Sequence, residues 1–179
     1  MTHRRAVFLD RDGVLNQAEV REGKPYPPAS VTEVKILPGV VEALQCLKEA
    51  GFVLIVVSNQ PDMARGTAQQ ISIEAINAYL AECLPIDRFI MCYHDESDGC
   101  DCRKPRPGML FTGAQEFNVD LARSFMVGDR WRDMEAGQQA GCKTFFVDHG
   151  YTEKQPMFFD FHVSSLEEAA QIILRESIQ

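Results

Sequence analysis

Short apolar runs alternate with longer stretches of mixed character along this chain. Each short run is bounded by turn residues, as expected for strands that are buried on both faces. These runs cover residues 5–9, 52–57, 88–93, 124–127 and 144–147. Between and after them, apolar residues recur at helical spacing within 41–50, 73–83, 107–117, 131–140 and 166–178. The alternation predicts an α/β fold with a mostly parallel sheet and helices on both of its faces.

Polar side chains that can do chemistry follow the ends of the apolar runs. In an open α/β sheet, ligands bind beyond the carboxyl ends of the strands. The residues at these ends are Asp10, Asp12, Ser58, Asn59, Gln60, Asp129 and the segment 92–102. The long loops 11–37 and 93–106 start from the same edge, and loops of this length in a compact domain usually serve function. We therefore expect the functional site at this edge.

Asp10 and Asp12 are the strongest candidates for chemistry. They are two residues apart, so their side chains leave the strand on the same side. Two carboxylates this close repel each other unless a cation or a proton lies between them. Mg2+ prefers carboxylate oxygens, water and phosphate as ligands. The pair favours a nucleophile and an acid/base group at a magnesium site, although these residues alone also fit an Asp-Gly turn.

Further positions along the chain could complete such a site. Ser58 could donate to a phosphate oxygen, although a Ser at a strand end more often caps a turn. Lys104 could neutralise a phosphoryl oxygen, unless it belongs to a solvated basic turn. Asp129 and Asp133 share a face if a helix starts there, but Asp133 is also a favoured acid for a first helical turn.

The order of these motifs resembles the haloacid-dehalogenase-like (HAD) hydrolase superfamily. Asp-x-Asp-Gly-Val follows the first run, Ser-Asn-Gln the second, a Lys precedes a helix, and Gly-Asp-x-x-x-Asp follows the fourth run. The match covers nearly the whole chain, and it implies a Rossmann-like fold with Mg2+-dependent phosphoryl transfer. No long insertion follows Asp12 or separates the second and third runs, so we expect no separate cap domain.

The resemblance also implies a role for each motif residue. Asp10 would attack phosphorus and form an aspartyl-phosphate. Asp12 would protonate the leaving oxygen and then take a proton from the hydrolytic water. Ser58 and Lys104 would hold the transferring phosphoryl group. The Mg2+ ligands would be the Asp10 carboxylate, the Asp12 backbone carbonyl and Asp129, with Asp133 supporting them.

A second metal signal lies in the loop after the third run. Cys92, His94, Cys100 and Cys102 supply three thiolates and one imidazole, the donor set of a closed tetrahedral zinc site. The polar loop between them has no core of its own, so a bound Zn2+ would fix its shape. The alternative is a set of incidental cysteines in a loop.

The cysteine loop narrows the resemblance within the superfamily. Cys-x-His and Cys-x-Cys directly before Arg-Lys-Pro, together with the stretch 59–66, are similar to the zinc-bearing branch within subfamily IIIA. That branch contains the D-glycero-D-manno-heptose 1,7-bisphosphate phosphatases and the histidinol-phosphate phosphatases. It implies a phosphorylated sugar as substrate, with heptose bisphosphate first and histidinol phosphate as the alternative. Substrate contacts are then expected from Asn59, Gln60, Arg65, Arg103 and Arg130.

Length and charge limit the classes of partner. The 179 residues suit one domain, 1–179, and the net charge of −8 argues against nucleic acid as the partner. No apolar run approaches the roughly 18 residues that span a membrane, and the one near the N-terminus is too short for a secretory signal. We expect a cytoplasmic monomer. The remaining cysteines are expected to be small core residues: Cys46, Cys83 and Cys142.

Two other classes of protein share parts of this pattern. A phospho-aspartate signalling domain also has an α/β layout with an Asp, a Lys and Mg2+. Such receivers usually place the phosphorylated Asp at the end of the third strand, but here that run ends in Cys92-Tyr93-His94. A zinc-stabilised binding module with a vestigial acidic site is the other possibility, and the intact set of Asp10, Asp12, Lys104 and Asp129 argues against it.

Overall fold

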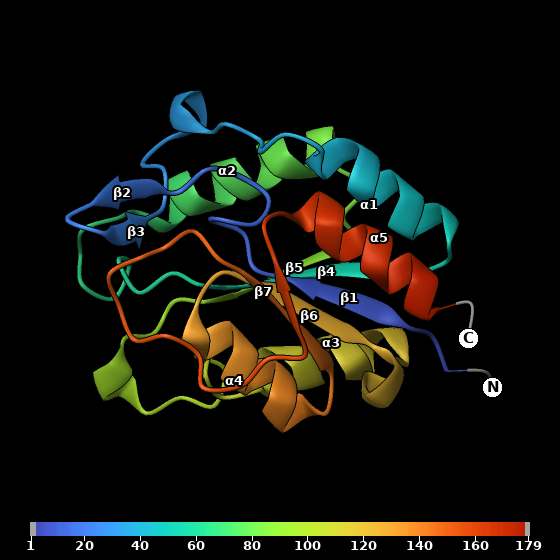
Figure 1. The fold of residues 1–179 in the computed structure, drawn as a ribbon. Coiled ribbons are helices and arrows are strands. Elements are labelled where there is room, and N and C mark those ends of the chain that lie inside the picture. Colours follow the sequence, from blue (N-terminus) through green and yellow to red (C-terminus); the bar gives the residue numbers. More distant parts are fainter. Residues whose placement is uncertain (1–2, 178–179) are drawn as a thin grey trace.

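The computed structural model describes residues 3–177, and its main sheet has six parallel strands (Figure 1). Across the sheet the order is β5-β4-β1-β6-β7-β8. The chain therefore starts at the centre and winds outward to both edges, as in doubly wound folds. The strands are β1 Ala6–Leu9, β4 Val53–Asn59, β5 Arg88–Cys92, β6 Phe125–Gly128, β7 Lys143–Val147 and β8 Phe161–Val163.

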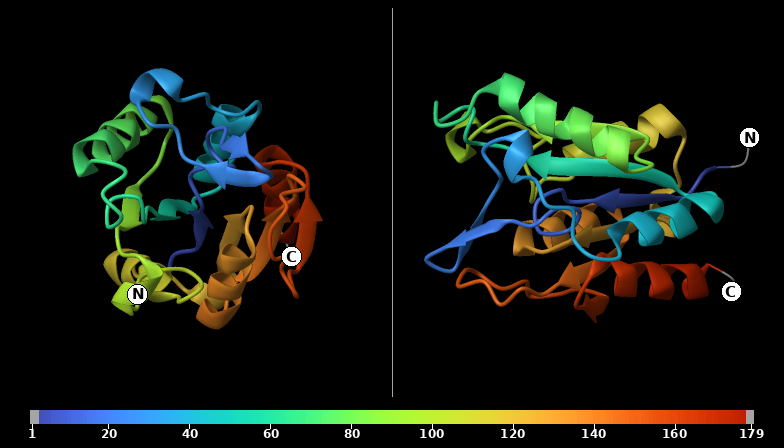
Figure 2. Two further views of the ribbon diagram at one scale, coloured as in Figure 1. Left: turned by 90° about the vertical axis from the view of Figure 1, so that its left-hand side faces the viewer. Right: turned by 90° about the horizontal axis from the view of Figure 1, so that it is seen from above.

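Within residues 3–177, five α-helices cover the two faces of this sheet. They are α1 Val40–Glu49, α2 Gln70–Cys83, α3 Gly108–Phe117, α4 Trp131–Ala140 and α5 Leu166–Glu176. Figures 1 and 2 show α1, α2 and α5 on one face and α3 and α4 on the other. This three-layer arrangement follows from the alternation of strands and helices along the chain.

Strand side chains alternate between two hydrophobic cores, one on each face of the sheet. In β1, Val7 and Leu9 pack into the core under α1 and α5, whereas Ala6 and Phe8 pack into the core under α3 and α4. All four side chains of β1 are fully buried. A strand that is covered on both faces has no polar side, which explains why these runs are continuously apolar.

The prediction of an α/β fold with helices on both faces is confirmed. All five strand runs and all five helical stretches form elements close to the expected positions. The last helix ends at Glu176, and Ile178, which belonged to the predicted stretch, lies outside the described residues. The expectation of core cysteines was wrong for Cys46 and Cys83, which are exposed because their helical positions face solvent, whereas Cys142 is buried.

The structure adds two features that the apolar pattern did not predict. Strand β8 extends one edge of the sheet, and the long loop after β1 contains an antiparallel hairpin of β2 Glu19–Arg21 and β3 Lys24–Tyr26. Each of these three strands is only three residues long, and the two hairpin strands are largely exposed. None of them therefore has an apolar run from which it could be predicted. In Figures 1 and 2 the hairpin projects beyond the carboxyl ends of the central strands, away from the chain termini.

Among residues 3–177, no helix is both long and apolar enough to cross a membrane.

Candidate active site

The central strand β1 delivers Asp10 to the carboxyl edge of the sheet. The Asp10 N–H donates to the Val127 carbonyl of β6 at 3.0 Å, so the strand ladder fixes the backbone at this point. Gly13 has a φ of 89°, and a Cβ there would lie 1.9 Å from Asp129 Oδ2. Only glycine lets the loop pass so close to Asp129. The Asp-x-Asp-Gly motif therefore brings the ends of β1 and β6 into contact.

Asp10, Asp129 and Asp133 form a buried carboxylate cluster. One oxygen from each lies within 4.8 Å of the others. Both carboxylate oxygens of Asp129 are buried and have no hydrogen-bond partner among the described residues. Buried acceptors without partners are costly unless a ligand satisfies them, and carboxylate oxygens are preferred Mg2+ ligands. The residues present therefore fit a Mg2+ ion.

Burial and mutual repulsion make this cluster unfavourable without a cation. Burial raises the pKa of Asp10 to about 6, Lys104 opposes that rise, and the charges of Asp133 and Asp12 add to it. Burial, and then the charges of Asp10 and Asp133, raise the pKa of Asp129 well above its usual range. A bound cation would reverse both effects, because it favours the ionised carboxylates.

Lys104 supplies the counter-charge within the protein. Its Nζ lies 3.0 Å from Asp10 Oδ1 and 2.6 Å from Asp133 Oδ1, and it donates to the Val57 carbonyl at 2.7 Å. The side chain is buried, which alone would lower the pKa of its ammonium, but the two carboxylates outweigh burial and raise this pKa. Lys104 is therefore charged and fixed beside Asp10.

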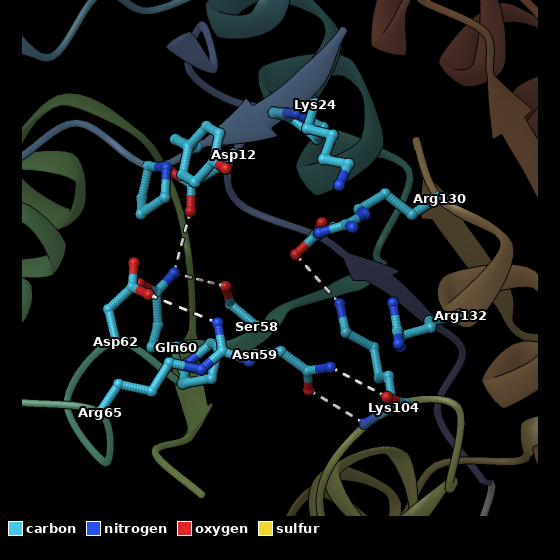
Figure 3. Close-up of a pocket in the computed structure, with 15 residues that line it drawn as sticks. Asp12, Lys24, Ser58, Asn59, Gln60, Asp62, Arg65, Lys104, Arg130 and Arg132 are labelled. Carbon is cyan, nitrogen blue, oxygen red and sulfur yellow. Dashed lines mark hydrogen bonds and ion pairs between the residues drawn. The ribbon is translucent and has the colours of Figure 1, made fainter. Parts of the chain in front are cut away.

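The end of β4 positions both Lys104 and Asp12. Asn59 donates from Nδ2 to the Lys104 carbonyl at 2.9 Å and accepts from the Lys104 N–H at 3.0 Å. Gln60 Nε2 donates to Ser58 Oγ at 3.0 Å and to Asp12 Oδ2 at 2.9 Å (Figure 3). Ser58, Asn59 and Gln60 also line the pocket that contains Asp10. The side-chain amides of Asn59 and Gln60 therefore organise the site from within the pocket wall.

Asp12 is also held by residues that the sequence interpretation did not single out. Arg11 is fully buried, and its Nε and Nη2 donate to the Asp12 carboxylate at 3.1–3.3 Å. Its Nη1 donates to Asn77 Oδ1 on α2 at 2.9 Å, which ties the motif loop to that helix. Asn16 Nδ2 donates to Asp12 Oδ1 at 2.9 Å. Asp12 thus has a fixed orientation at the pocket wall.

A pocket of about 310 Å³ opens over these groups (Figure 3). Its volume lies at the lower end of the range for small-molecule sites. Arg65 and Arg130 line it, as predicted. Arg103 lines a neighbouring cavity instead, and its Nη1 donates to the His94 carbonyl at 3.2 Å. The contact of Arg103 with the substrate stays a prediction, and the position of its side chain outside the active-site pocket does not favour it.

The predicted zinc ligands come together in the loop after β5. The Sγ atoms of Cys92, Cys100 and Cys102 and the Nδ1 atom of His94 lie 2.9–3.7 Å from their neighbours in the cluster. These are donors that Zn2+ prefers, and they lie close enough together to share one ion. Lys104 follows two residues after Cys102. A metal bound by this cluster would anchor the loop that carries Lys104.

Comparisons with known proteins agree with this geometry. The sequence model of the haloacid dehalogenase-like hydrolases matches residues 27–141. The chain belongs to this family. Among the relatives of this haloacid dehalogenase-like hydrolase, the D-glycero-beta-D-manno-heptose-1,7-bisphosphate 7-phosphatase of Bordetella bronchiseptica is 37% identical over 153 residues, which cover 83% of each chain. The enzyme of the same name from Escherichia coli K12 is 34% identical over 151 residues, covering 78% of this chain and 76% of its own.

A solved structure gives the same result for this hydrolase. The crystal structure of the D,D-heptose 1,7-bisphosphate phosphatase from B. bronchiseptica, complexed with magnesium and phosphate, superposes with a TM-score of 0.77 at 32% identity. The match covers 96% of this chain and 99% of that chain. Family, relatives and fold together make this haloacid dehalogenase-like hydrolase a phosphatase.

Proposed function

We propose that this phosphatase hydrolyses a phosphomonoester of a sugar bisphosphate, with D-glycero-D-manno-heptose 1,7-bisphosphate as the substrate and heptose 1-phosphate as the product. The observation that carries the proposal is the position of Asp10. Its carboxylate lines the pocket between Lys104 and the Asp129–Asp133 pair. Relatives that bear the heptose bisphosphatase name support the choice of sugar.

Asp10 is suited to be the nucleophile. Its Oδ1 accepts from the Arg11 N–H and from Lys104 Nζ, whereas among residues 3–177 no hydrogen bond is donated to its Oδ2. Oδ2 is therefore the oxygen that can attack. In the first step Oδ2 forms a bond to phosphorus as the bond between phosphorus and the sugar oxygen breaks. The product of this step is an aspartyl-phosphate on Asp10.

Asp12 is suited to move the protons. A sugar alkoxide leaves poorly unless it is protonated, so Asp12 would donate a proton to the leaving oxygen. In the second step Asp12 takes a proton from a water molecule as that water attacks phosphorus, and the Asp10–phosphorus bond breaks. Arg11, Asn16 and Gln60 hold the Asp12 carboxylate in the fixed orientation that both transfers require.

Charge neutralisation is the remaining requirement of phosphoryl transfer. Lys104 is placed to neutralise one phosphoryl oxygen, and the Ser58 hydroxyl can donate to another. Asp10, Asp129 and the Asp12 backbone carbonyl would hold Mg2+, with Asp133 in support. When bound, Mg2+ would neutralise charge on the phosphoryl oxygens. Cys92, His94, Cys100 and Cys102 would hold a structural Zn2+, which keeps the Lys104 loop in place.

A substrate panel tests the proposal. Phosphate release is measured with Mg2+ for both anomers of heptose 1,7-bisphosphate, for fructose 1,6-bisphosphate and for histidinol phosphate. We expect the highest kcat/KM for one of the heptose anomers and loss of about a thousandfold or more in Asp10→Asn. Asp120→Asn, at the opposite end of β6, serves as the matched control and should keep wild-type turnover.

Different results would contradict different parts of the proposal. A preference for histidinol phosphate would replace the sugar and leave the catalytic roles in place. Unchanged turnover in Asp10→Asn would contradict the nucleophile. A stable phosphorylated protein without turnover would instead indicate a signalling domain.

A further inference from the structure

The positive charges of the pocket differ in whether a carboxylate already neutralises them. Arg65 donates two hydrogen bonds to Asp95, at 3.0 and 2.8 Å, and lies 3.8 Å from Asp62. Arg130 donates two hydrogen bonds to Glu153, at 2.8 and 2.5 Å. Paired charges of this kind are already satisfied within the protein. Neither arginine is therefore free to meet an anion without first giving up a partner.

Lys24 and Arg132 line the same pocket without such partners. Among residues 3–177, no carboxylate lies within salt-bridge distance of the Lys24 ammonium. In the described part of the chain, the one carboxylate within salt-bridge distance of Arg132 is that of Glu96, at 3.9 Å. The Glu96 side chain is 79% exposed, whereas that of Arg132 is 20% exposed. Arg132 is thus a half-buried cation that lines the same pocket as Arg130.

These two side chains come from different elements and line the same pocket. Lys24 belongs to the β2–β3 hairpin, and Arg132 belongs to the first turn of α4. In Figure 3, Lys24, Arg130 and Arg132 lie along the upper and right-hand wall of the pocket, and Asp62 and Arg65 lie on the left. A cavity wall with two cations and little neutralising charge attracts an anionic group.

We propose that Lys24 and Arg132 form a subsite for a second anionic group of the substrate, the phosphate that is not cleaved. This inference rests on the proposed function, because it takes Asp10 as the site of cleavage. The guanidinium of Arg132 would bind two phosphate oxygens, and the Lys24 ammonium would cover the group from the hairpin. The hairpin thereby acts as a specificity element for bisphosphates.

A second cavity adjoins the active-site pocket and offers another place for the second phosphate. A cavity of about 590 Å³ lies between the hairpin and α2, and it shares Arg65 with the active-site pocket. A substrate that extended that way would place its second phosphate near Arg65. The paired state of Arg65 argues against this direction, and so does Asp62, which lines both cavities.

Kinetics on a matched pair of substrates test the subsite. The kcat/KM values are measured for heptose 1,7-bisphosphate and for heptose 7-phosphate, which lacks the second phosphate. In Lys24→Ala and in Arg132→Ala we expect the bisphosphate value to fall about tenfold more than the monophosphate value. Lys35→Ala and Arg123→Ala are the controls, because both residues are exposed and lie outside this pocket, and they should leave both values unchanged.

The outcomes separate the subsite from the proposed function. Equal losses on the two substrates, or loss of discrimination only in Arg65→Ala, would overturn the subsite while the phosphatase reaction stands. If the wild-type protein hydrolyses neither substrate, the proposed sugar fails. The subsite is then measured as binding of fructose 1,6-bisphosphate against fructose 6-phosphate by calorimetry, where the same tenfold difference is expected and its absence overturns the subsite.

Discussion

The two clusters of metal-ligating side chains at this edge of the sheet are built in opposite ways. The aspartate cluster joins the ends of β1 and β6 to the start of α4, and all of its members are buried. The cysteine–histidine cluster sits on the loop after β5, where only Cys92 is buried and His94 is exposed. The sheet thus shapes the first cluster, whereas the second joins the end of β5 to a partly exposed loop.

This difference teaches what each metal would do for the protein. The aspartates are held together by the fold against their own repulsion, so a cation relieves strain that already exists. The cysteines and the histidine stand on a polar loop, so a metal would provide the loop with its fixed shape. We expect the first site to exchange its ion without unfolding and the second to lose local order with its ion.

The largest expected effect comes from Asp129→Asn. Removing this carboxylate takes away a Mg2+ ligand, so turnover should fall by about a thousandfold. It also removes repulsion from Asp10, so the metal-free protein should melt roughly 3–8 °C higher. Phosphate release and thermal unfolding with and without Mg2+ check both results. A lower melting temperature in the metal-free variant would contradict the stored repulsion.

Arg11→Lys should have the next largest effect. It tests whether Arg11 orients Asp12 independently of the aspartate cluster. A lysine keeps the charge but cannot grip the Asp12 carboxylate with two donors or reach Asn77 in the same geometry. We expect kcat to fall about 10- to 100-fold with KM nearly constant, and the acidic limb of the pH–kcat profile to move. Wild-type kcat and pH profile in this variant would show that Asp12 needs no such support.

Cys102→Ser should separate the second cluster from the first. The variant should lose Zn2+, as measured by elemental analysis, and lose protection from hydrogen exchange in residues 93–106. Turnover should fall about tenfold, because Lys104 belongs to the same loop. Cys46→Ser, an exposed cysteine outside the cluster, is the control. Full hydrogen-exchange protection of the loop in Cys102→Ser would mean that the loop needs no metal.

The smallest effect is on the pH dependence of Mg2+ binding to the aspartates. The folded-state pKa of Asp10 is raised from 3.8 to about 6, so the metal-free fold holds a proton that the unfolded chain has released. That contribution to stability is present below the unfolded value and is lost as pH rises through about 6. Below pH 6 this proton competes with Mg2+, so affinity should fall by up to about tenfold for each pH step of one. Calorimetry at pH 7.5 and 5.5 measures the Mg2+ affinity, and equal affinities at the two pH values would contradict the raised pKa of Asp10.

The sequence predicts the main chemistry because each motif residue follows a recognisable strand. Asp10, Ser58 and Asp129 all come directly after apolar runs, and parallel strands bring those ends together. Asn77 also left a signal, since it lies within the apolar stripe of Ile73, Ile76 and Leu80 and is buried with them. A polar side chain in such a stripe needs a buried partner, and that partner is Arg11.

The hairpin and its lysine could not be predicted in the same way. Strands β2 and β3 are three residues each and largely exposed, so no hydrophobic period distinguishes them from a loop. The placement of Lys24 at the pocket depends on how this hairpin packs against the segment after β7, where the Thr152 N–H donates to the Gly23 carbonyl. Likewise, the long distance between Arg132 and Glu96 depends on how separate elements pack, and a single sequence does not give that packing.

We expect Asp10 to carry the phosphoryl group during turnover. The most direct test is to quench the protein in acid during steady-state hydrolysis of heptose 1,7-bisphosphate with Mg2+ and to map the phosphorylated peptide by mass spectrometry. We expect a hydroxylamine-sensitive phosphoryl group on Asp10 that is absent from Asp10→Asn. Turnover with no acyl-phosphate, or with one on a different residue, would contradict it.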